Sequence, residues 1–163
     1  GCHFRKDDVL FSSFRKETFN AVISFGVMEH LNKEEPMGES GKDLHFLKEA
    51  YRILKPGGEF FIFHLPSKLS WSEKVAKVLG LWYHQQKYSK EEIEKLFFQT
   101  KFKNLEIKSC DLLPGQSGRI SPVLGFLTNL FTPFLIFLDK LLLQTPFSRF
   151  DQNFSIVAQK REN

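Results

Sequence analysis

The sequence has no Gly-x-Gly pattern, and only 10 of its 163 residues are glycine. Glycine-rich loops that cradle a nucleotide with backbone amides commonly use this pattern, so these residues contain no such loop. Its two cysteines, Cys2 and Cys110, do not have the spacing of metal ligands, and we expect no metal site. Because no secretory leader is visible, the default expectation is a reduced, cytoplasmic chain.

Long blocks of one charge sign are also absent. The net charge is +4, but acidic and basic residues are mixed locally, as in Arg5-Lys6-Asp7-Asp8. A nucleic-acid surface typically shows a basic stripe with stacking aromatics, so we expect no nucleic-acid partner. Tyrosine and tryptophan are scarce (3 and 2) beside 19 phenylalanines, which must be buried in a core, a partner, a lipid surface or an apolar substrate pocket.

The length allows one domain with one core, and its centre reads as a strand, a helix and a second strand. Residues 19–25 and 59–65 read as strands, and their centres, residues 21–23 and 60–63, are apolar without alternation, which is typical of strands that are covered on both faces. Between them, apolar side chains recur with the helical period at Leu44, Leu47, Ala50, Tyr51 and Leu54. Pro56 ends the helix and Gly57-Gly58 supply a turn, so we predict a parallel βαβ unit.

Further strands and helices are predicted on both sides of this unit. Residues 1–8 read as a strand, residues 10–18 as a loop, and residues 104–110 and 153–160 as strands in which apolar and polar positions alternate. Ser70 with Glu73, and Ser89 with Glu92, have the spacing of capping boxes at the start of helices.

Residues 120–138 carry no charged side chain. Ser121-Pro122 and Thr132-Pro133 each look like an N-cap followed by proline, which predicts two helices of about 15 Å rather than one helix long enough for a hydrocarbon layer of about 30 Å. We interpret residues 112–152 as a helical apolar insertion, in which residues 126–143 supply most of the apolar face.

Several short motifs follow one another in order along this chain. Asp8 is followed eleven positions later by Phe19-Asn20, then by Met28-Glu29-His30-Leu31, and then by Leu54-Lys55-Pro56-Gly57-Gly58. This ordered set resembles the C-terminal portion of a class I S-adenosylmethionine-dependent methyltransferase, with a domain of the methyltransferase type 11 kind. The resemblance covers most of residues 4–111 and 153–160; Asn20 stands where the family usually has aspartate.

The resemblance implies an α/β fold with a partial Rossmann-like methyltransferase sheet. Strands 19–25, 59–65 and 104–110 would be parallel, and strand 153–160 would lie antiparallel between the last two. Residues 1–163 would form a single partial domain whose N-terminal half, with its glycine loop, is missing. The parent enzyme would transfer a methyl group from S-adenosylmethionine, while the isolated chain would be inactive or nearly so and strand 19–25 would be left as an unpaired edge.

Cofactor contacts are expected where the strands end, because ligands of open α/β sheets bind at the carboxyl ends of strands. The resemblance implies that Asp8 accepts a hydrogen bond from the adenine amino group, with the Val9 amide nearby. Ser24, Phe25 and Gly26 follow the next strand, and Gly26 would allow a ligand close to the backbone. A solvated loop aspartate and an ordinary turn glycine explain Asp8 and Gly26 equally simply.

Glu29 and His30 are the candidate catalytic residues. His30 could act as a base on a hydroxyl or amine acceptor, and Glu29 could orient it, accept a proton or help bind a metal. Alternatively, both residues cap the next helix or bond to loop amides. His64 is a weaker candidate, and His3, His45 and His84 read as surface or core residues.

The apolar insertion suggests the kind of partner. A lid rich in phenylalanine suits a small or lipid-linked acceptor or shallow docking on a membrane, whereas extra core or a homodimer contact would explain it equally well. The rival function is a non-catalytic methyltransferase-like protein that binds a partner or a membrane through residues 126–143. The expected location is therefore cytoplasmic, with membrane association as an option.

Overall fold

The core of the molecule is one sheet whose strand order confirms the expected arrangement. The computed structural model describes residues 1–31, 41–80, 84, 86–112 and 130–162. Strands β1 (Phe19–Phe25), β2 (Leu54–Pro66), β3 (Phe102–Cys110) and β4 (Asn153–Lys160) form a four-stranded sheet in the order β1-β2-β4-β3. β1 and β2 are parallel, with Ile23 opposite Phe61, and β4 is antiparallel to both β2 and β3.

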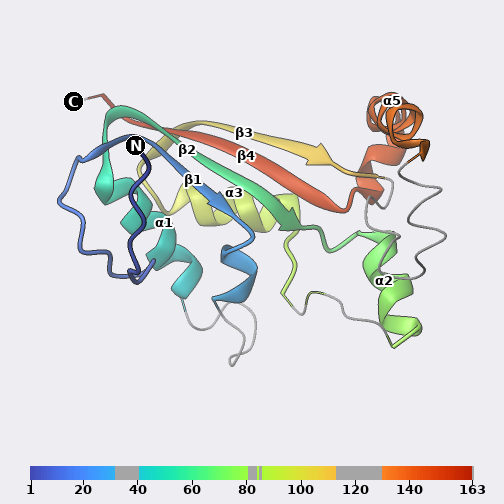
Figure 1. Ribbon diagram of the computed structural model, residues 1–163, viewed down its shortest axis with the longest axis horizontal. Coiled ribbons are helices and arrows are strands. Elements are labelled where there is room, and N and C mark those ends of the chain that lie inside the picture. Colours follow the sequence, from blue (N-terminus) through green and yellow to red (C-terminus); the bar gives the residue numbers. More distant parts are fainter. Residues whose placement is uncertain (32–40, 81–83, 85, 113–129, 163) are drawn as a thin grey trace.

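Two helices cover one face of this sheet. Helix α1 (Lys42–Ile53) joins β1 to β2, and α3 (Lys90–Phe98) precedes β3; both lie beneath the sheet in Figure 1. They bury Leu47 and Ile93, each with no exposed surface, against Phe60 and Ile156 of the sheet. The alternation predicted for β3 and β4 is confirmed, since every second residue of β4 is buried.

The other face of β1 and β2 is open among the described residues, so the prediction of strands covered on both faces is wrong. Ile23 and Phe25 are 67% and 64% exposed, and Phe61 and Phe63, which pair with them across the sheet, stack with ring centroids 6.3 Å apart. α1 and α3 lie on the same side (Figure 1), and no described helix covers this second face. The apolar runs therefore predicted the two strands correctly, but they did not predict that only one face of these strands is covered.

The predicted strand over residues 1–8 is also wrong. These residues are exposed and have no regular secondary structure. A strand is stable when its backbone N–H and C=O groups pair with a neighbour, and no described strand pairs with this segment. Asp8 therefore sits in a loop rather than at the end of a strand.

The turn between α1 and β2 lies inside the sheet as a bulge. Leu54 pairs with Phe19 and Glu59 pairs with Ala21, so residues 55–58 bulge out between two paired positions. A Cβ atom on Gly58 would lie 2.9 Å from the Lys55 carbonyl oxygen and 3.0 Å from the Asn20 carbonyl oxygen. Glycine is required here because the backbones of β1 and the bulge approach closely.

Replacing Gly58 with alanine is expected to lower the free energy of unfolding by about 1–3 kcal/mol, because two backbone carbonyls must move apart. Urea unfolding followed by far-UV circular dichroism measures the change. Lys55→Ala, at an exposed position in the same bulge, is the control and should leave the midpoint nearly unchanged. Equal midpoints for Gly58→Ala and the wild type would contradict the close approach.

Three helices lie together at one end of the molecule (Figure 1). They are α2 (Trp71–Val78), α5 (Thr132–Leu143) and the short 3-10 helix η3 (Pro146–Phe150). α5 confirms the helix predicted at this place, but Thr132 is its first residue rather than its N-cap, which is Phe131 and makes no side-chain cap hydrogen bond. The helix predicted to begin at Ser121-Pro122 lies outside the described residues.

Asp151 and Gln152 connect the elements at this end. The Gln152 backbone bonds to Asp111 and to Ser67, and its side chain bonds to Ser72 and to the Leu112 carbonyl. Asp151 is 2% exposed, and its Oδ2 has no hydrogen-bond partner among the described residues. Burial raises the pKa of the Asp151 carboxyl, although Ser109 and Ser67 donate hydrogen bonds that oppose the shift.

Asp151→Asn is expected to stabilise the fold by about 1 kcal/mol at neutral pH, because it removes a buried charge that is only partly compensated. A carboxyl with a raised folded-state pKa costs nothing below its unfolded-state pKa; the cost grows as the pH rises above that value and is complete above the folded-state pKa. The gain should therefore shrink as the pH falls toward 3.8. Thermal unfolding of both proteins across this range tests the sign; a loss of stability at neutral pH would contradict it.

Candidate functional site

A cavity of about 170 Å³ lies beside β1, between α1 and the N-terminal segment. It brings together three of the five predicted cofactor residues, Asp8, Val9 and Ser24. The rest of its wall is mostly apolar and comes from Asp7, Ser12, Phe14, Val22, Ile23, Val27, Phe46, Glu49, Ala50 and Ile53. Its volume is below the roughly 300 Å³ of a typical small-molecule pocket, so it could enclose part of a cofactor but not the whole.

Asp8 and Val9 form the rim of this cavity on the loop side. The Asp8 side chain is exposed, and its Oδ1 accepts a hydrogen bond from the Leu10 N–H at 2.8 Å. Val9 is 42% exposed. Asp8 therefore offers a solvent-facing acceptor at the mouth, next to the backbone of Val9.

Ser24 lies at the inner wall of the cavity. It is 4% exposed, and its Oγ has no hydrogen-bond partner among the described residues. A buried hydroxyl without a partner is costly, so a polar atom placed in the cavity would satisfy it. This is the clearest sign that the cavity is suited to a polar ligand.

The other two predicted cofactor residues do not line the cavity. Phe25 points to the open face of the sheet, where its ring packs against His64 with centroids 4.7 Å apart. Gly26 has a φ of 63°, a conformation that favours glycine, and its N–H bonds to the Phe63 carbonyl. Gly26 therefore acts as the turn residue that ends β1.

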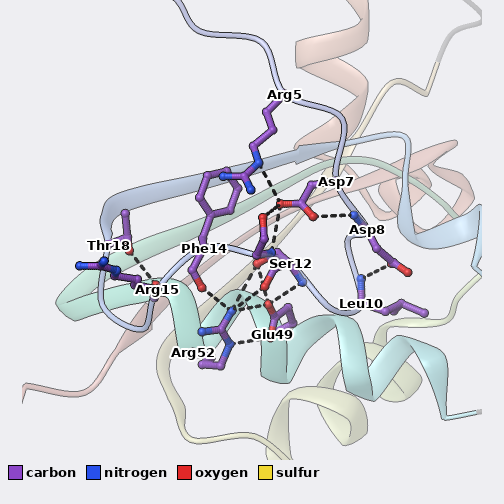
Figure 2. Close-up of polar contacts among 11 residues, drawn as sticks. Arg5, Asp7, Asp8, Leu10, Ser12, Phe14, Arg15, Thr18, Glu49 and Arg52 are labelled. Atoms are coloured by element: carbon purple, nitrogen blue, oxygen red, sulfur yellow. Dashed lines mark hydrogen bonds and ion pairs between the residues drawn. The ribbon is translucent and has the colours of Figure 1, made fainter.

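The loop that carries the cavity wall is fastened to α1 by Glu49 and Arg52 (Figure 2). Glu49 Oε1 accepts hydrogen bonds from the Ser12 N–H at 2.9 Å and from the Ser12 hydroxyl at 2.6 Å. The Arg52 guanidinium lies 2.7 Å from the same oxygen and donates to the Phe14 carbonyl at 2.8 Å. The hydrogen bond from Arg52 holds the pKa of the Glu49 carboxyl below its usual value.

Asp7 and Asp8 are adjacent but have different tasks. Asp7 Oδ2 accepts from the Ser13 hydroxyl at 2.5 Å and from the Ser13 N–H at 3.0 Å, and Asp7 Oδ1 accepts from the Asp8 N–H (Figure 2). These bonds lower the pKa of the Asp7 carboxyl, chiefly through the Ser13 hydroxyl. Asp7 shapes the loop, and Asp8 is the more available acceptor.

Glu29 and His30 lie on the 3-10 helix η1 (Met28–His30), which follows β1. Glu29 is 5% exposed, and its Oε1 lies 3.8 Å from His30 Nε2, whereas the His30 ring reaches the surface. The same Glu29 oxygen would lie 3.4 Å from a Cβ atom added to Gly26. Neither residue lines the cavity, but Val27, the N-cap of η1, does.

A buried polar network supports η1 from below. The Tyr88 hydroxyl donates to the Met28 carbonyl at 3.4 Å, and Gln86 Nε2 contacts both Tyr88 and Asp43. Burial, with the nearby Asp43 charge, strongly raises the pKa of the Tyr88 hydroxyl, which therefore stays protonated. These contacts fix the position of the peptide that leads into Glu29 and His30.

His84 was not among the predicted site residues, yet its ring centroid lies 6.2 Å from that of His30.

The structure also explains why the predicted capping box of α2 is incomplete. Ser70 accepts from the Glu73 N–H as expected, but the Glu73 carboxylate bonds to His84 Nδ1 at 2.8 Å and pairs with Lys87. Ser89 and Glu92 do form the complete box. No spacing rule would have found a histidine eleven residues beyond its carboxylate.

His64, the weaker candidate, lies two residues before the end of β2, on the open face of the sheet. Its Nδ1 lies 4.0 Å from Asp111 Oδ2, and both side chains are about half exposed.

In the described part of the chain, no group of three or more His, Cys, Asp or Glu side chains could hold a metal ion. In the same residues, no helix has the length and apolar character needed to cross a bilayer.

The N-terminal part of the chain is similar to a known family and to a known protein. A family model described as a methyltransferase domain matches residues 2–62. The probable tRNA methyltransferase 9B of Mus musculus is 35% identical over 63 residues, which make up 39% of this chain and 13% of the mouse protein.

Solved structures match nearly the whole chain. A SAM-dependent methyltransferase from Archaeoglobus fulgidus superposes with a TM-score of 0.58 at 14% identity, covering 96% of this chain and 66% of that one. A putative methyltransferase in complex with the Trm112 activator of Haloferax volcanii gives 0.56 at 17% identity, with 96% and 60% covered. Haemonchus contortus phosphoethanolamine N-methyltransferase 2, solved with S-adenosyl-L-methionine, gives 0.50 at 20% identity, with 96% and 36% covered. The chain thus spans between about a third and two thirds of these proteins.

Proposed function

We propose that this chain is the C-terminal part of a class I S-adenosylmethionine-dependent methyltransferase domain that methylates a small or lipid-like acceptor. The observation that carries the proposal is the cavity in which Asp8 and Val9 meet the unpartnered Ser24 hydroxyl. The predicted Rossmann-like sheet is the framework around it.

The residues of the cavity fit the adenosyl end of S-adenosylmethionine. Asp8 would accept a hydrogen bond from the adenine amino group, the Val9 amide would lie against the ring, and Ser24 would find a partner for its hydroxyl. The apolar wall from Val22, Val27 and Phe46 suits a flat ring. Bound there, the cofactor supplies an activated methyl group on a sulfonium.

The remainder of the cofactor site would come from a preceding half-domain. Two features support this: β1 is at the edge of the described sheet, and its open face exposes Ile23 and Phe25. An added strand and its helix would pair with that edge and cover those side chains. A glycine loop on this half would cradle the methionine end.

Methyl transfer needs an aligned acceptor and a dry site more than it needs strong acid–base chemistry. Where the acceptor is a hydroxyl or an ammonium group, His30 would take up its proton and Glu29 would orient the imidazole. This role suits a half-exposed histidine next to a buried carboxylate, close to the Val27 side of the cavity.

Two other functions are supported by one observation each. The mouse relative, 35% identical over 63 residues, is named a probable tRNA methyltransferase, which makes tRNA the alternative acceptor. The uncovered helix α5 favours a non-catalytic protein that binds a partner or a membrane through residues 126–143.

The test is calorimetric titration of S-adenosylhomocysteine into this chain and into the chain extended by the segment encoded directly upstream. We expect dissociation constants well above micromolar for the chain alone and tight binding for the extended protein, weakened roughly tenfold by Asp8→Asn through loss of an acceptor. Glu94→Gln, on the exposed side of α3, is the control. An extended protein that does not bind the cofactor would overturn the proposal, and micromolar binding by the chain alone would refute the need for a glycine loop.

A further inference from the structure

Helix α2 has its polar side against the protein and its apolar side toward solvent. Ser72 bonds to Gln152, and Glu73 bonds to His84 and Lys87, so these polar side chains face inward. No residue of α2 is buried, and its apolar positions are exposed: Trp71 38%, Val75 46% and Val78 86%. Leu69 and Leu79, just outside the two ends of the helix, are 49% and 61% exposed. An ordinary surface helix shows the opposite arrangement.

The charges on the outward side of α2 are all positive. Lys74 and Lys77 are exposed and lie along one side of the apolar stripe, while Glu73, the only acid between residues 69 and 80, is turned inward. An apolar stripe bordered by lysine is the arrangement of a helix that lies in the interface of a negatively charged membrane.

A second uncovered helix lies at the same end of the molecule (Figure 1). α5 buries none of its residues, and Phe134, Phe137 and Leu141, which share one side of the helix, are 60%, 65% and 51% exposed. Asp139 and Lys140 are the only charged residues of α5, and their charges cancel. α5 thus adds apolar area without opposing the positive charge of α2.

We propose that the outward side of α2, assisted by α5, docks this protein on the surface of an anionic lipid membrane. Val75 and Val78 would enter the headgroup region, and Lys74 and Lys77 would contact lipid phosphates, while the Trp71 indole N–H keeps its 2.8 Å hydrogen bond to the Leu112 carbonyl. The docking is peripheral. The proposal does not depend on the cofactor cavity, so it stands or falls separately from the proposed methyl transfer.

The test is flotation of the folded chain with vesicles of phosphatidylcholine alone and with vesicles of equal parts phosphatidylcholine and phosphatidylserine. We expect the chain to float with the anionic vesicles and to remain largely behind with the neutral ones. Val78→Glu should weaken binding on the order of tenfold or more, because a deeply placed apolar side chain is replaced by a charge. Lys74→Gln with Lys77→Gln should weaken it by roughly 30-fold, at about 1 kcal/mol for each lysine.

Two matched variants separate this surface from general stickiness. Phe98, at the end of α3, is 91% exposed, and Phe25 lies on the open face of the sheet. Phe98→Glu and Phe25→Glu should float like the wild type. Circular dichroism of each variant verifies that it is folded, which is expected because Val78, Phe98 and both lysines are exposed.

Four outcomes would overturn the proposal. The first is a folded wild-type chain that does not float, and the second is equal flotation with neutral and anionic vesicles. The third is binding that survives Val78→Glu but is lost in Phe25→Glu, which would assign lipid contact to the open sheet face. A dimer in analytical ultracentrifugation that Val78→Glu dissociates, without flotation, would show that a second copy covers α2.

Discussion

Replacing Phe60 with alanine is expected to lower the free energy of unfolding by about 3–5 kcal/mol. Phe60 lies at the centre of β2 with no exposed surface. Its ring meets Phe46 of α1 at 5.8 Å and stacks on Phe102 of β3 at 5.7 Å, so one side chain joins the sheet to the helix layer. The substitution would leave a cavity that neighbouring strands cannot close.

Urea unfolding of Phe60→Ala and of Phe61→Ala measures this effect. Phe61 is the next residue on the same strand but faces the open side of the sheet, so its loss should cost much less. Similar costs for the two variants would contradict the assignment of a single covered face. This comparison also tests the open face on which the proposed half-domain would pack.

Glu49→Ala is expected to cost about 2–3 kcal/mol of stability and to open the cavity wall formed by residues 12–14. The substitution removes the acceptor for the Ser12 N–H and hydroxyl and leaves the Arg52 guanidinium without its carboxylate. Because Arg52 is partly exposed, water would offset some of this loss. Glu94→Ala, on the exposed side of α3, is the control and should have little effect.

The effect of Glu49→Ala should depend on pH. The folded-state pKa of Glu49 lies below its usual 4.5, so its contribution is complete above that pH and is lost as the pH falls through the folded-state value. The stability difference between wild type and variant should therefore be large at pH 7 and should shrink in acid. A difference that stays constant down to pH 3 would mean that the ion pair and its hydrogen bonds contribute nothing.

The arrangement of the sheet was predictable from sequence because two features of the chain agree on it. The apolar runs at 19–25 and 59–65, the helix between them and the alternation in 104–110 and 153–160 give the strands, and the family resemblance gives their order. The strand predicted over residues 1–8 was wrong because pairing requires a neighbour, which the composition of a segment does not report. Exposure of Ile23 and Phe25 was missed for a similar reason.

The candidate site was predictable in part. Asp8, Val9 and Ser24 were chosen from their places near strand ends, and they do meet at one cavity, whereas Phe25 and Gly26 follow the same strand but face elsewhere. The bonds of Arg52 to Ser12 and Phe14 span about forty residues and have no sequence signature. The approach of His84 to His30 depends on the path of the chain after α2.

In the proposed function, the cavity beside β1 holds the adenosyl end of the cofactor. The most direct measurement is a nuclear magnetic resonance titration of the nitrogen-15-labelled chain with S-adenosylhomocysteine, taken to concentrations that populate a weak site. We expect the largest shifts in the backbone amides of Asp8, Val9 and Ser24, and little change at Lys103 or Glu106 in β3. Shifts confined to other parts of the sheet, with the amides of Val9 and Ser24 unchanged, would contradict the account.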